Sequence, residues 1–200
     1  MSAPGPHRHR DRLAQVSLCV VVAISIARIF LPAGASGLGS GLGVMAGGAM
    51  AAILGETYPD LYAAIGVHSG LAYGSANDVM SAFTAMRGQG GIERAPARTG
   101  GPRRIVFHGS ADTTVHPSNA GRIIAGDGRT SRSEHGPTGE TRGYSRLVVE
   151  GTDGPHECWI IDGAQHAWAG GNASGSYTDP RGPNASEAMV RFFLRGASDG

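Results

Sequence analysis

The middle of the chain alternates between helically spaced apolar residues and short apolar runs. Apolar side chains recur at helical intervals over 46–58, and Pro59 cannot continue a helix, so a helix is predicted to end just before it. The runs 63–68 and 104–108 are short and mostly apolar, which is typical of strands buried on both faces of a parallel sheet. Helices that alternate with such strands indicate an α/β fold.

The remaining segments are predicted from their turn residues and spacing. Residues 145–150 and 157–162 are two strand-like runs separated by Gly151-Thr152-Asp153-Gly154-Pro155-His156, which indicates a hairpin. The other predicted segments are a linker over 36–43, a surface loop with one short helix over 69–101, a helix over 117–124, a polar loop over 126–143, and a closing helix over 185–194 capped by Asn184 and Glu187.

The segment Gly43-Val44-Met45-Ala46-Gly47 has the glycine spacing of a nucleophile elbow. In α/β-hydrolases the pattern G-x-S-x-G forms a sharp strand-to-helix turn, which exposes the central serine and lets the next backbone N–H hold an oxyanion. Here Met45 stands at the serine position and Ala46 at the oxyanion position. A thioether has no proton to lose and cannot attack an ester, so a glycine-rich turn that opens a helix is the alternative interpretation.

A carboxylate follows the second apolar run, in His108-Gly109-Ser110-Ala111-Asp112. Active sites of parallel sheets gather at the carboxyl ends of strands, so Asp112 is placed to be the acid of a catalytic triad. Pro117, which opens the next predicted helix, completes a strand–turn–helix context. A plain turn-forming aspartate is the alternative.

His166 follows the last predicted strand, in Gly163-Ala164-Gln165-His166-Ala167-Trp168. A single histidine is usually a plain surface or core residue. The chain order of Met45, Asp112 and His166, however, is the nucleophile–acid–histidine order of α/β-hydrolases. We therefore predict that His166 is the catalytic base and that Asp112 orients its imidazole.

The first 35 residues have the order of a secretory signal. Arginines within 1–12 precede an apolar run over 16–27, and Ala33-Gly34-Ala35 has the small residues of a cleavage site. Arg28 interrupts the apolar stretch and disfavours a stable membrane span. A signal peptide, a displaced N-terminus and a membrane anchor stay open as interpretations, each separate from a domain over 36–200.

Composition limits the function classes and the kinds of site. A chain of 200 residues with 40% hydrophobic residues and 33 glycines suits a single loop-rich domain. Its net charge of +1, without a basic stripe, excludes a nucleic-acid binder. Cys19 and Cys158 have neither a disulfide framework nor metal-ligand spacing, so no metal or other cofactor is predicted.

Seven segments between Met45 and Arg195 form a specific pattern, and they are 46–51, 58–64, 68–70, 106–109, 113–117, 163–168 and 175–180. This pattern resembles the C-terminal part of the polyhydroxybutyrate depolymerase family of esterases. That family is a branch of the α/β-hydrolases which also includes feruloyl and acetylxylan esterase-like members.

The resemblance implies a truncated α/β-hydrolase, with a mainly parallel sheet flanked by helices and without the family's first strands. It also implies serine-type hydrolysis of carboxylic esters, with a polyester or an acylated carbohydrate as substrate and an extracellular location. Carried over by position, Asp112 is the acid, His166 the histidine, Met45 the nucleophile position and Ala46 the oxyanion backbone donor.

Two departures from the family pattern bear on activity. Met45 replaces the serine, and the family's N-terminal half, with its first strands and an upstream oxyanion N–H, has no counterpart. Removal of the serine costs a serine hydrolase about 10⁶ in turnover, so this chain is predicted to be inactive or impaired. A damaged or mis-started gene explains both departures. A non-catalytic protein that binds a polymer around Trp168 and Tyr177 is the alternative.

Overall fold

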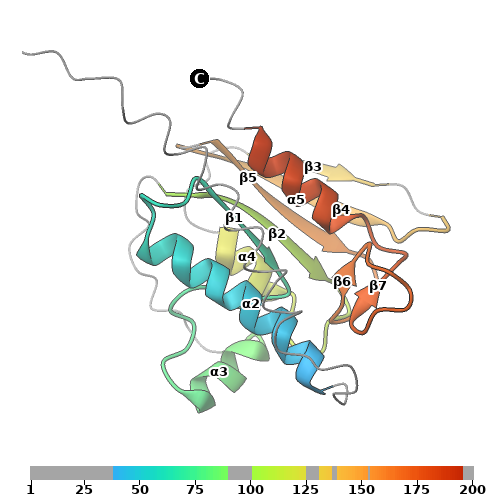
Figure 1. Cartoon of the computed structure of the whole chain (residues 1–200), viewed down its shortest axis with the longest axis horizontal. Helices are drawn as coiled ribbons and strands as arrows, with labels where there is room; N and C mark the ends of the chain where they lie inside the picture. Colours follow the sequence, from blue (N-terminus) through green and yellow to red (C-terminus); the bar gives the residue numbers. More distant parts are fainter. Residues whose placement is uncertain (1–37, 90–100, 125–130, 137–138, 153, 196–200) are drawn as a thin grey trace, which may run out of the picture.

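The computed structural model describes residues 38–89, 101–124, 131–136, 139–152 and 154–195 (Figure 1). For 38–45, 131 and 132 it describes the backbone alone. Residues 1–35, interpreted as a possible signal peptide, displaced N-terminus or membrane anchor, lie outside the described residues. Within the described ranges, no helix is both long enough and apolar enough to cross a membrane.

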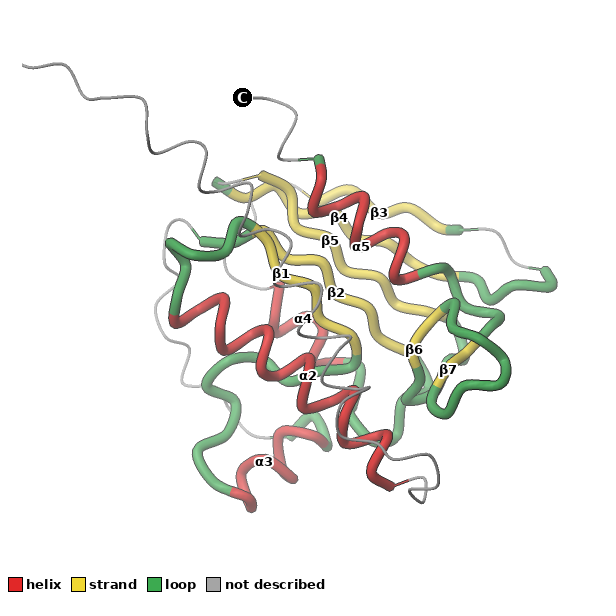
Figure 2. Tube along the Cα trace, viewed as in Figure 1, coloured by secondary structure: helices red, strands yellow, loops and turns green. Residues whose placement is uncertain are grey.

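One five-stranded sheet runs through the described part of the chain, in the order β1 (Ala64–His68), β2 (Arg103–Gly109), β5 (Gly154–Ile161), β4 (Tyr144–Gly151) and β3 (Ser131–His135). β1 is parallel to β2 and β2 to β5, whereas β4 is antiparallel to both of its neighbours. Four strands therefore run in one direction and only β4 in the other. The sheet is drawn in yellow in Figure 2. This arrangement confirms the predicted α/β fold with a mainly parallel sheet.

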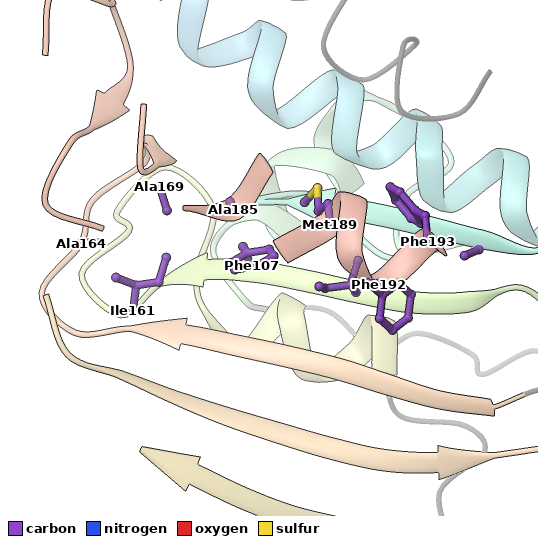
Figure 3. Close-up of a cluster of buried hydrophobic side chains, with 10 residues drawn as sticks. Phe107, Ile161, Ala164, Ala169, Ala185, Met189, Phe192 and Phe193 are labelled. Carbon is purple, nitrogen blue, oxygen red and sulfur yellow. The ribbon is translucent and has the colours of Figure 1, made fainter. Parts of the chain in front are cut away.

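Helices cover both faces of the sheet. On one face, Met189 and Phe192 of α5 (Ala185–Leu194) pack in one cluster with Phe107 of β2 (Figure 3). On the other face, α2 (Leu38–Thr57) and α4 (Ser118–Ile124) pack in a cluster that includes Val106. Because consecutive residues of a strand point to opposite faces, Val106 belongs to one cluster and Phe107 to the other, and β2 is buried on both faces as predicted.

The helix α2 begins earlier than predicted. The linker predicted over 36–43 is wrong from Leu38 onward, and residues 43–47 lie within the helix rather than at a strand-to-helix turn. Each glycine lowers helix propensity by about 1 kcal/mol, which is why this stretch resembled a loop. A helix that is already nucleated and docked on β1 can nevertheless extend through such residues, because propagation costs far less than nucleation.

Two of the glycines let α2 approach the sheet closely. A Cβ atom at Gly48 would lie 3.1 Å from the carbonyl oxygen of His68, and one at Gly55 would lie 2.9 Å from the Ile65 side chain. Side chains at these positions would therefore push the helix away from β1. The close contact brings α2 directly to the carboxyl end of β1, where His68 and Ser69 lie.

Several shorter elements complete the fold. The predicted hairpin is confirmed as β4 and β5, and the short helix expected within 69–101 is α3 (Val79–Met86), which is capped by Asp78. The predicted polar loop over 126–143 is wrong where β3 lies. The sequence of this edge strand is polar like a loop, but its backbone pairs with β4. His166 does not follow the last strand, since a short parallel pair, β6 (Trp168–Ala169) and β7 (Thr178–Asp179), comes after it.

The closing helix is held at both ends. At its start, the side-chain oxygen of Asn184 accepts a hydrogen bond from the Glu187 backbone N–H at 3.1 Å, which confirms the predicted cap. At its end, the guanidinium of Arg103 donates to the Phe192 carbonyl at 3.0 Å. A cation at this end also favours the helix dipole, so β2 anchors α5 through a charge as well as through apolar contacts.

Candidate active site

Asp112 lies in the turn between β2 and α4, and its side chain is fully buried. Its Oδ1 accepts hydrogen bonds from the backbone N–H groups of Thr114 and Val115, both at 2.9 Å. The turn thus holds the carboxylate through its own backbone. As predicted from the sequence, the acid follows directly on the carboxyl end of a parallel strand.

The imidazole of His166 meets this carboxylate. Nδ1 of His166 lies 2.7 Å from Oδ2 of Asp112, and the two side chains are 5% and 0% exposed. Because an ionised carboxylate only accepts, Nδ1 carries the proton, and in the neutral ring Nε2 holds the lone pair. A histidine in this tautomer can take a proton through Nε2 from a nucleophile. The expected contact between these two residues is therefore present, and their catalytic roles stay a prediction.

The loops that carry the two side chains are bonded to each other. The Ala111 N–H donates to the Ala164 carbonyl at 2.9 Å, and the Gly163 N–H donates to Oγ of Ser110 at 2.8 Å. Ser110 in turn donates its N–H to the Ile161 carbonyl at the end of β5. The parallel pairing of β2 and β5 places both loops at one edge of the sheet, and these bonds fix their separation.

Electrostatics favours an ionised Asp112. Burial by itself would raise the pKa of this carboxyl group. Hydrogen bonds from His108, His166 and the Val115 N–H outweigh burial, and together with the charge of His166 they hold the pKa well below its ordinary value. Asp112 therefore stays a carboxylate and a hydrogen-bond acceptor under all ordinary conditions.

A second buried histidine, His68, ends β1 beside this pair. Its ring stacks on Trp168 with centroids 4.8 Å apart, and its Nε2 accepts the Ala169 N–H at 3.0 Å. Burial first, and then the nearby His108 and His166, lower the pKa of His68 to about 3, although Asp112 opposes the shift. His68 is thus a neutral group that anchors the segment directly after His166.

Ser69 is a candidate for a substitute nucleophile, because its φ of 51° is unusual and its Oγ lies 3.2 Å from Nδ1 of His68. The tautomer of His68 argues against this role. Since Nε2 accepts from the Ala169 N–H, the proton of the neutral ring is on Nδ1 and points at Ser69. His68 cannot take a proton from Ser69 in this arrangement. The pair is structural.

Comparison with known proteins identifies the family. The model of the family "Esterase PHB depolymerase" matches residues 15–129, which is more than half of the chain. The chain belongs to this esterase family. The matched range includes the acid loop with Asp112 and ends before His166. It also begins within the first 35 residues, for which a leader is one of the open interpretations.

Individual relatives in the esterase family match shorter stretches. The chain is 33% identical over 93 residues to acetylxylan esterase A of Talaromyces purpureogenus, which covers 38% of this chain and 24% of that protein. It is 32% identical over 95 residues to poly(3-hydroxyalkanoate) depolymerase C of Paucimonas lemoignei, covering 41% and 22%. The chain thus spans about a quarter of the length of the curated relatives it matches.

A solved structure of an acetyl xylan esterase from Aspergillus awamori is also similar to this chain. The match has a TM-score of 0.44 and 20% sequence identity, and it covers 61% of this chain and 52% of that one.

In this depolymerase-family chain, two of the predicted site positions lie in α2. The backbone at Met45 is helical and its side chain lies outside the described residues, whereas Ala46 is exposed. In a continuous α-helix the N–H at position 46 faces the carbonyl at position 42, so it is not oriented as a free oxyanion donor in this conformation. The roles assigned to Met45 and Ala46 stay predictions.

The described residues of the esterase domain include no group of three or more His, Cys, Asp or Glu side chains arranged for a metal ion. Burial raises the pKa of Cys158 to about 12, so this residue is a thiol and a core side chain rather than a nucleophile.

Sequence reasoning assigned no role to His68 and His108. Both lie at the carboxyl ends of parallel strands, at the same edge of the sheet as the end of β5 that leads to His166. Their position at strand ends was the available signal, because active-site groups of parallel sheets gather there. The contacts of the two rings depend on the pairing of β1 with β2, which no local pattern specifies.

Gly109 joins β2 to the acid loop and allows a close backbone contact that a side chain would block. A Cβ atom there would lie 2.3 Å from the Ala164 carbonyl oxygen, which belongs to the histidine loop. We expect Gly109→Ala to lower the free energy of unfolding by about 1–3 kcal/mol, because backbone must shift to admit the methyl group. Urea denaturation measures this change.

The matched control is Gly121→Ala in α4, where a Cβ atom would meet no atom within 4 Å. This substitution should stabilise the protein by about 0.5–1 kcal/mol, since alanine loses less backbone entropy than glycine in a helix. Equal effects of the two substitutions would contradict the close packing of the acid and histidine loops.

Proposed function

We propose that this chain has the acid–base machinery of a serine-type carboxylic-ester hydrolase and that Met45 keeps it from turning over esters. His166 is the base, Asp112 is the residue that orients it, and position 45 is the nucleophile position. The 2.7 Å contact between His166 and Asp112 in a chain of the esterase family is the observation that carries the proposal.

The chemistry follows from the tautomer of His166. In a relative with serine at position 45, Nε2 of His166 takes the hydroxyl proton while the oxygen attacks the ester carbonyl. The backbone N–H of the residue at position 46 holds the resulting oxyanion. The imidazolium then returns its proton to the leaving alcohol, and water releases the acyl group from the serine by the same route. Asp112 stays ionised and stabilises the imidazolium in both steps.

The proposed substrates are polyesters or acylated carbohydrates. Relatives that cover part of this chain are named as an acetylxylan esterase and a poly(3-hydroxyalkanoate) depolymerase, and both names describe ester bonds in polymers. Polymers of this kind do not enter a cell, so an extracellular location is part of the proposal. The apolar stretch with its preceding arginines in the first 35 residues supports that location.

A non-catalytic role in polymer binding is the second candidate, because Met45 cannot act as a nucleophile. Trp168 supplies a partly exposed aromatic surface beside the site, with its indole N–H held by Oγ of Ser186 at 3.1 Å. An aromatic ring that is fixed in this way can bind a polymer without losing much conformational freedom. Tyr177 belongs to the same loop region, and its carbonyl accepts the Trp168 N–H.

Hydrolysis of p-nitrophenyl butyrate tests the proposal. The unaltered chain should hydrolyse this ester no faster than its His166→Ala variant, because a base without a nucleophile gives no turnover. A clear difference between these two proteins would show that another nucleophile exists and that the assignment of position 45 is wrong.

A second comparison tests the nucleophile position directly. Met45→Ser should hydrolyse the ester faster than the unaltered chain, and adding His166→Ala should abolish the gain. In complete serine hydrolases the serine contributes about 10⁶ in turnover, which is the upper limit of the expected gain. A folded Met45→Ser variant that stays at background would show that Met45 is not by itself what keeps the chain from turning over esters, and would contradict that part of the proposal.

A further inference from the structure

His108, near the end of β2, is fully buried and touches the same carboxylate as His166. Its Nε2 lies 2.8 Å from the Val115 carbonyl oxygen and 3.4 Å from Oδ2 of Asp112. Both neighbours can only accept hydrogen bonds, so Nε2 of His108 carries a proton. The single N–H is therefore shared between the carbonyl and the carboxylate.

The other ring nitrogen of His108 shows that the residue is not an ordinary core side chain. Nδ1 is buried and has no hydrogen-bond partner among the described residues. A buried polar atom without a partner destabilises the fold, and a hydrocarbon side chain of similar size would avoid that loss. The Nε2–H group is the feature that such a side chain would lack.

Among the residues that the structure describes, four N–H groups surround the Asp112 carboxylate. Oδ1 accepts from Thr114 and Val115, while Oδ2 accepts from His166 and makes the longer contact with His108. The carboxylate cannot rotate without breaking several of these contacts. Oδ2, the oxygen that holds His166, is shared by two imidazoles.

We propose that His108 is a positioning residue for the Asp112–His166 pair, whose Nε2–H shares Oδ2 with His166 and limits how strongly that oxygen attracts the His166 proton. This inference rests on the proposed function, because it concerns the same acid and base. Without the His108 donor, Oδ2 holds more negative charge toward His166. The imidazolium of His166 is then stabilised, and its Nδ1–H bond to Oδ2 becomes stronger.

A purely structural role is the competing explanation, since His108 also holds the Val115 carbonyl. The two explanations differ at His166. Loss of a loop anchor alone would change stability, whereas loss of a shared donor changes the titration and the proton resonance of His166. Among the described residues, Asp112 contacts His166, His108 contacts Asp112, and His68 interacts electrostatically with His166 but is buried and neutral.

The experiment is NMR spectroscopy of the full chain labelled with ¹⁵N. His108→Met removes the donor at similar volume, and it should raise the pKa of His166 by about 0.5 units or more and move its Nδ1–H resonance downfield. His108→Gln places an amide N–H near the position of Nε2 and should restore values close to those of the unaltered chain. An unchanged or lowered pKa of His166 in His108→Met would overturn the inference.

His156→Met is the matched control. His156 is also buried, but it lies at the opposite end of the sheet, in β5, where its Nδ1 accepts the Arg104 N–H at 3.0 Å. Its replacement removes a buried histidine without touching Asp112, so His166 should titrate as in the unaltered chain. A shift equal to that of His108→Met would mean that general destabilisation, and not the shared oxygen, causes the effect.

Two further measurements separate the inference from the proposed function. If Asp112→Asn leaves the titration of His166 unchanged, the acid–base pair itself is wrong and the proposed function fails with it. If Asp112→Asn shifts His166 and His108→Met does not, only the role of His108 is overturned. The ¹⁵N shifts of His108 in the unaltered chain need no variant, and an unprotonated Nε2 there would also overturn the inference.

Discussion

Acidification from pH 7 to pH 4 should destabilise this protein by about 3 kcal/mol through His68 alone. Burial first, and the positive potential of His108 and His166 second, lower the pKa of His68 from 6.5 to about 3 in the folded state. In the unfolded chain the ring titrates near its ordinary value. Between these two values the unfolded state binds the extra proton, so stability is present above about pH 6.5 and is lost as the pH falls toward 3.

His68→Phe isolates this contribution. Phenylalanine can keep the stacking on Trp168 but cannot accept the Ala169 N–H, so the variant should be less stable at pH 7 by about 1–3 kcal/mol. Because it has no proton to bind, its stability should fall less steeply, so its deficit at pH 7 should close or reverse as the unaltered chain loses about 3 kcal/mol between pH 7 and pH 4. Urea denaturation at several pH values measures both curves.

His116→Gln is the control for the pH series. His116 is exposed in the turn before α4, and its ring contacts Ser118, the first residue of that helix. This variant should follow the unaltered chain at every pH. If the curve for His68→Phe is also parallel to that of the unaltered chain, His68 is not a neutral buried group in the folded protein.

Asp112→Ala should lower the free energy of unfolding by about 3–5 kcal/mol, which is the usual cost of removing one partner of a buried charged contact. The carboxylate accepts from Thr114, Val115 and His166, and alanine leaves each of these N–H groups without its acceptor, two of them buried. The acid loop and the histidine loop lose their direct side-chain link at the same time. Thermal and urea denaturation at pH 7 measure the loss.

The matched control replaces an aspartate that accepts backbone N–H groups at the surface. Asp78 caps α3 by accepting from the Ser81 N–H at 2.7 Å and is exposed. Asp78→Ala should cost about 0.5–2 kcal/mol, as is usual for the loss of a helix cap. If Asp112→Ala loses no more stability than Asp78→Ala, then the Asp112 carboxylate is not a buried group held by four N–H contacts, and the description of the site is wrong.

The link between Asp112 and His166 could be predicted from sequence because it depends on a simple property of parallel sheets. Both residues follow the carboxyl end of a strand, and parallel neighbours present these ends at one edge. The prediction needed only the strands and their order in the chain. His108 and His68 occupy equivalent positions, but nothing local distinguishes a histidine that touches the acid from one that packs on Trp168.

Other elements escaped prediction because their stability comes from their neighbours. β3 is polar on both faces and shows no alternation, and it exists because the backbone of β4 pairs with it and Glu134 binds Arg146 at 2.7 Å. The start of α2 at Leu38 contradicts local propensity for a similar reason. A glycine-rich stretch extends a helix whose later turns are docked on β1, and that docking is invisible in the stretch itself.

The sequence by itself determined the alternation of helices and buried strands, the position of Asp112 and His166 at strand ends, and the esterase resemblance. The first two follow from periodicities and turn residues that act within a few positions of the chain, whereas the resemblance rests on seven matching segments. Only the tertiary structure decided that His108 contacts the carboxylate and that His68 packs on Trp168 beside the site. That arrangement depends on the register of β1 on β2. It also depends on the turn after β2, which brings the Asp112 carboxylate to within 3.4 Å of His108 in that strand. Contacts between residues distant in sequence depend on packing, which local patterns do not encode.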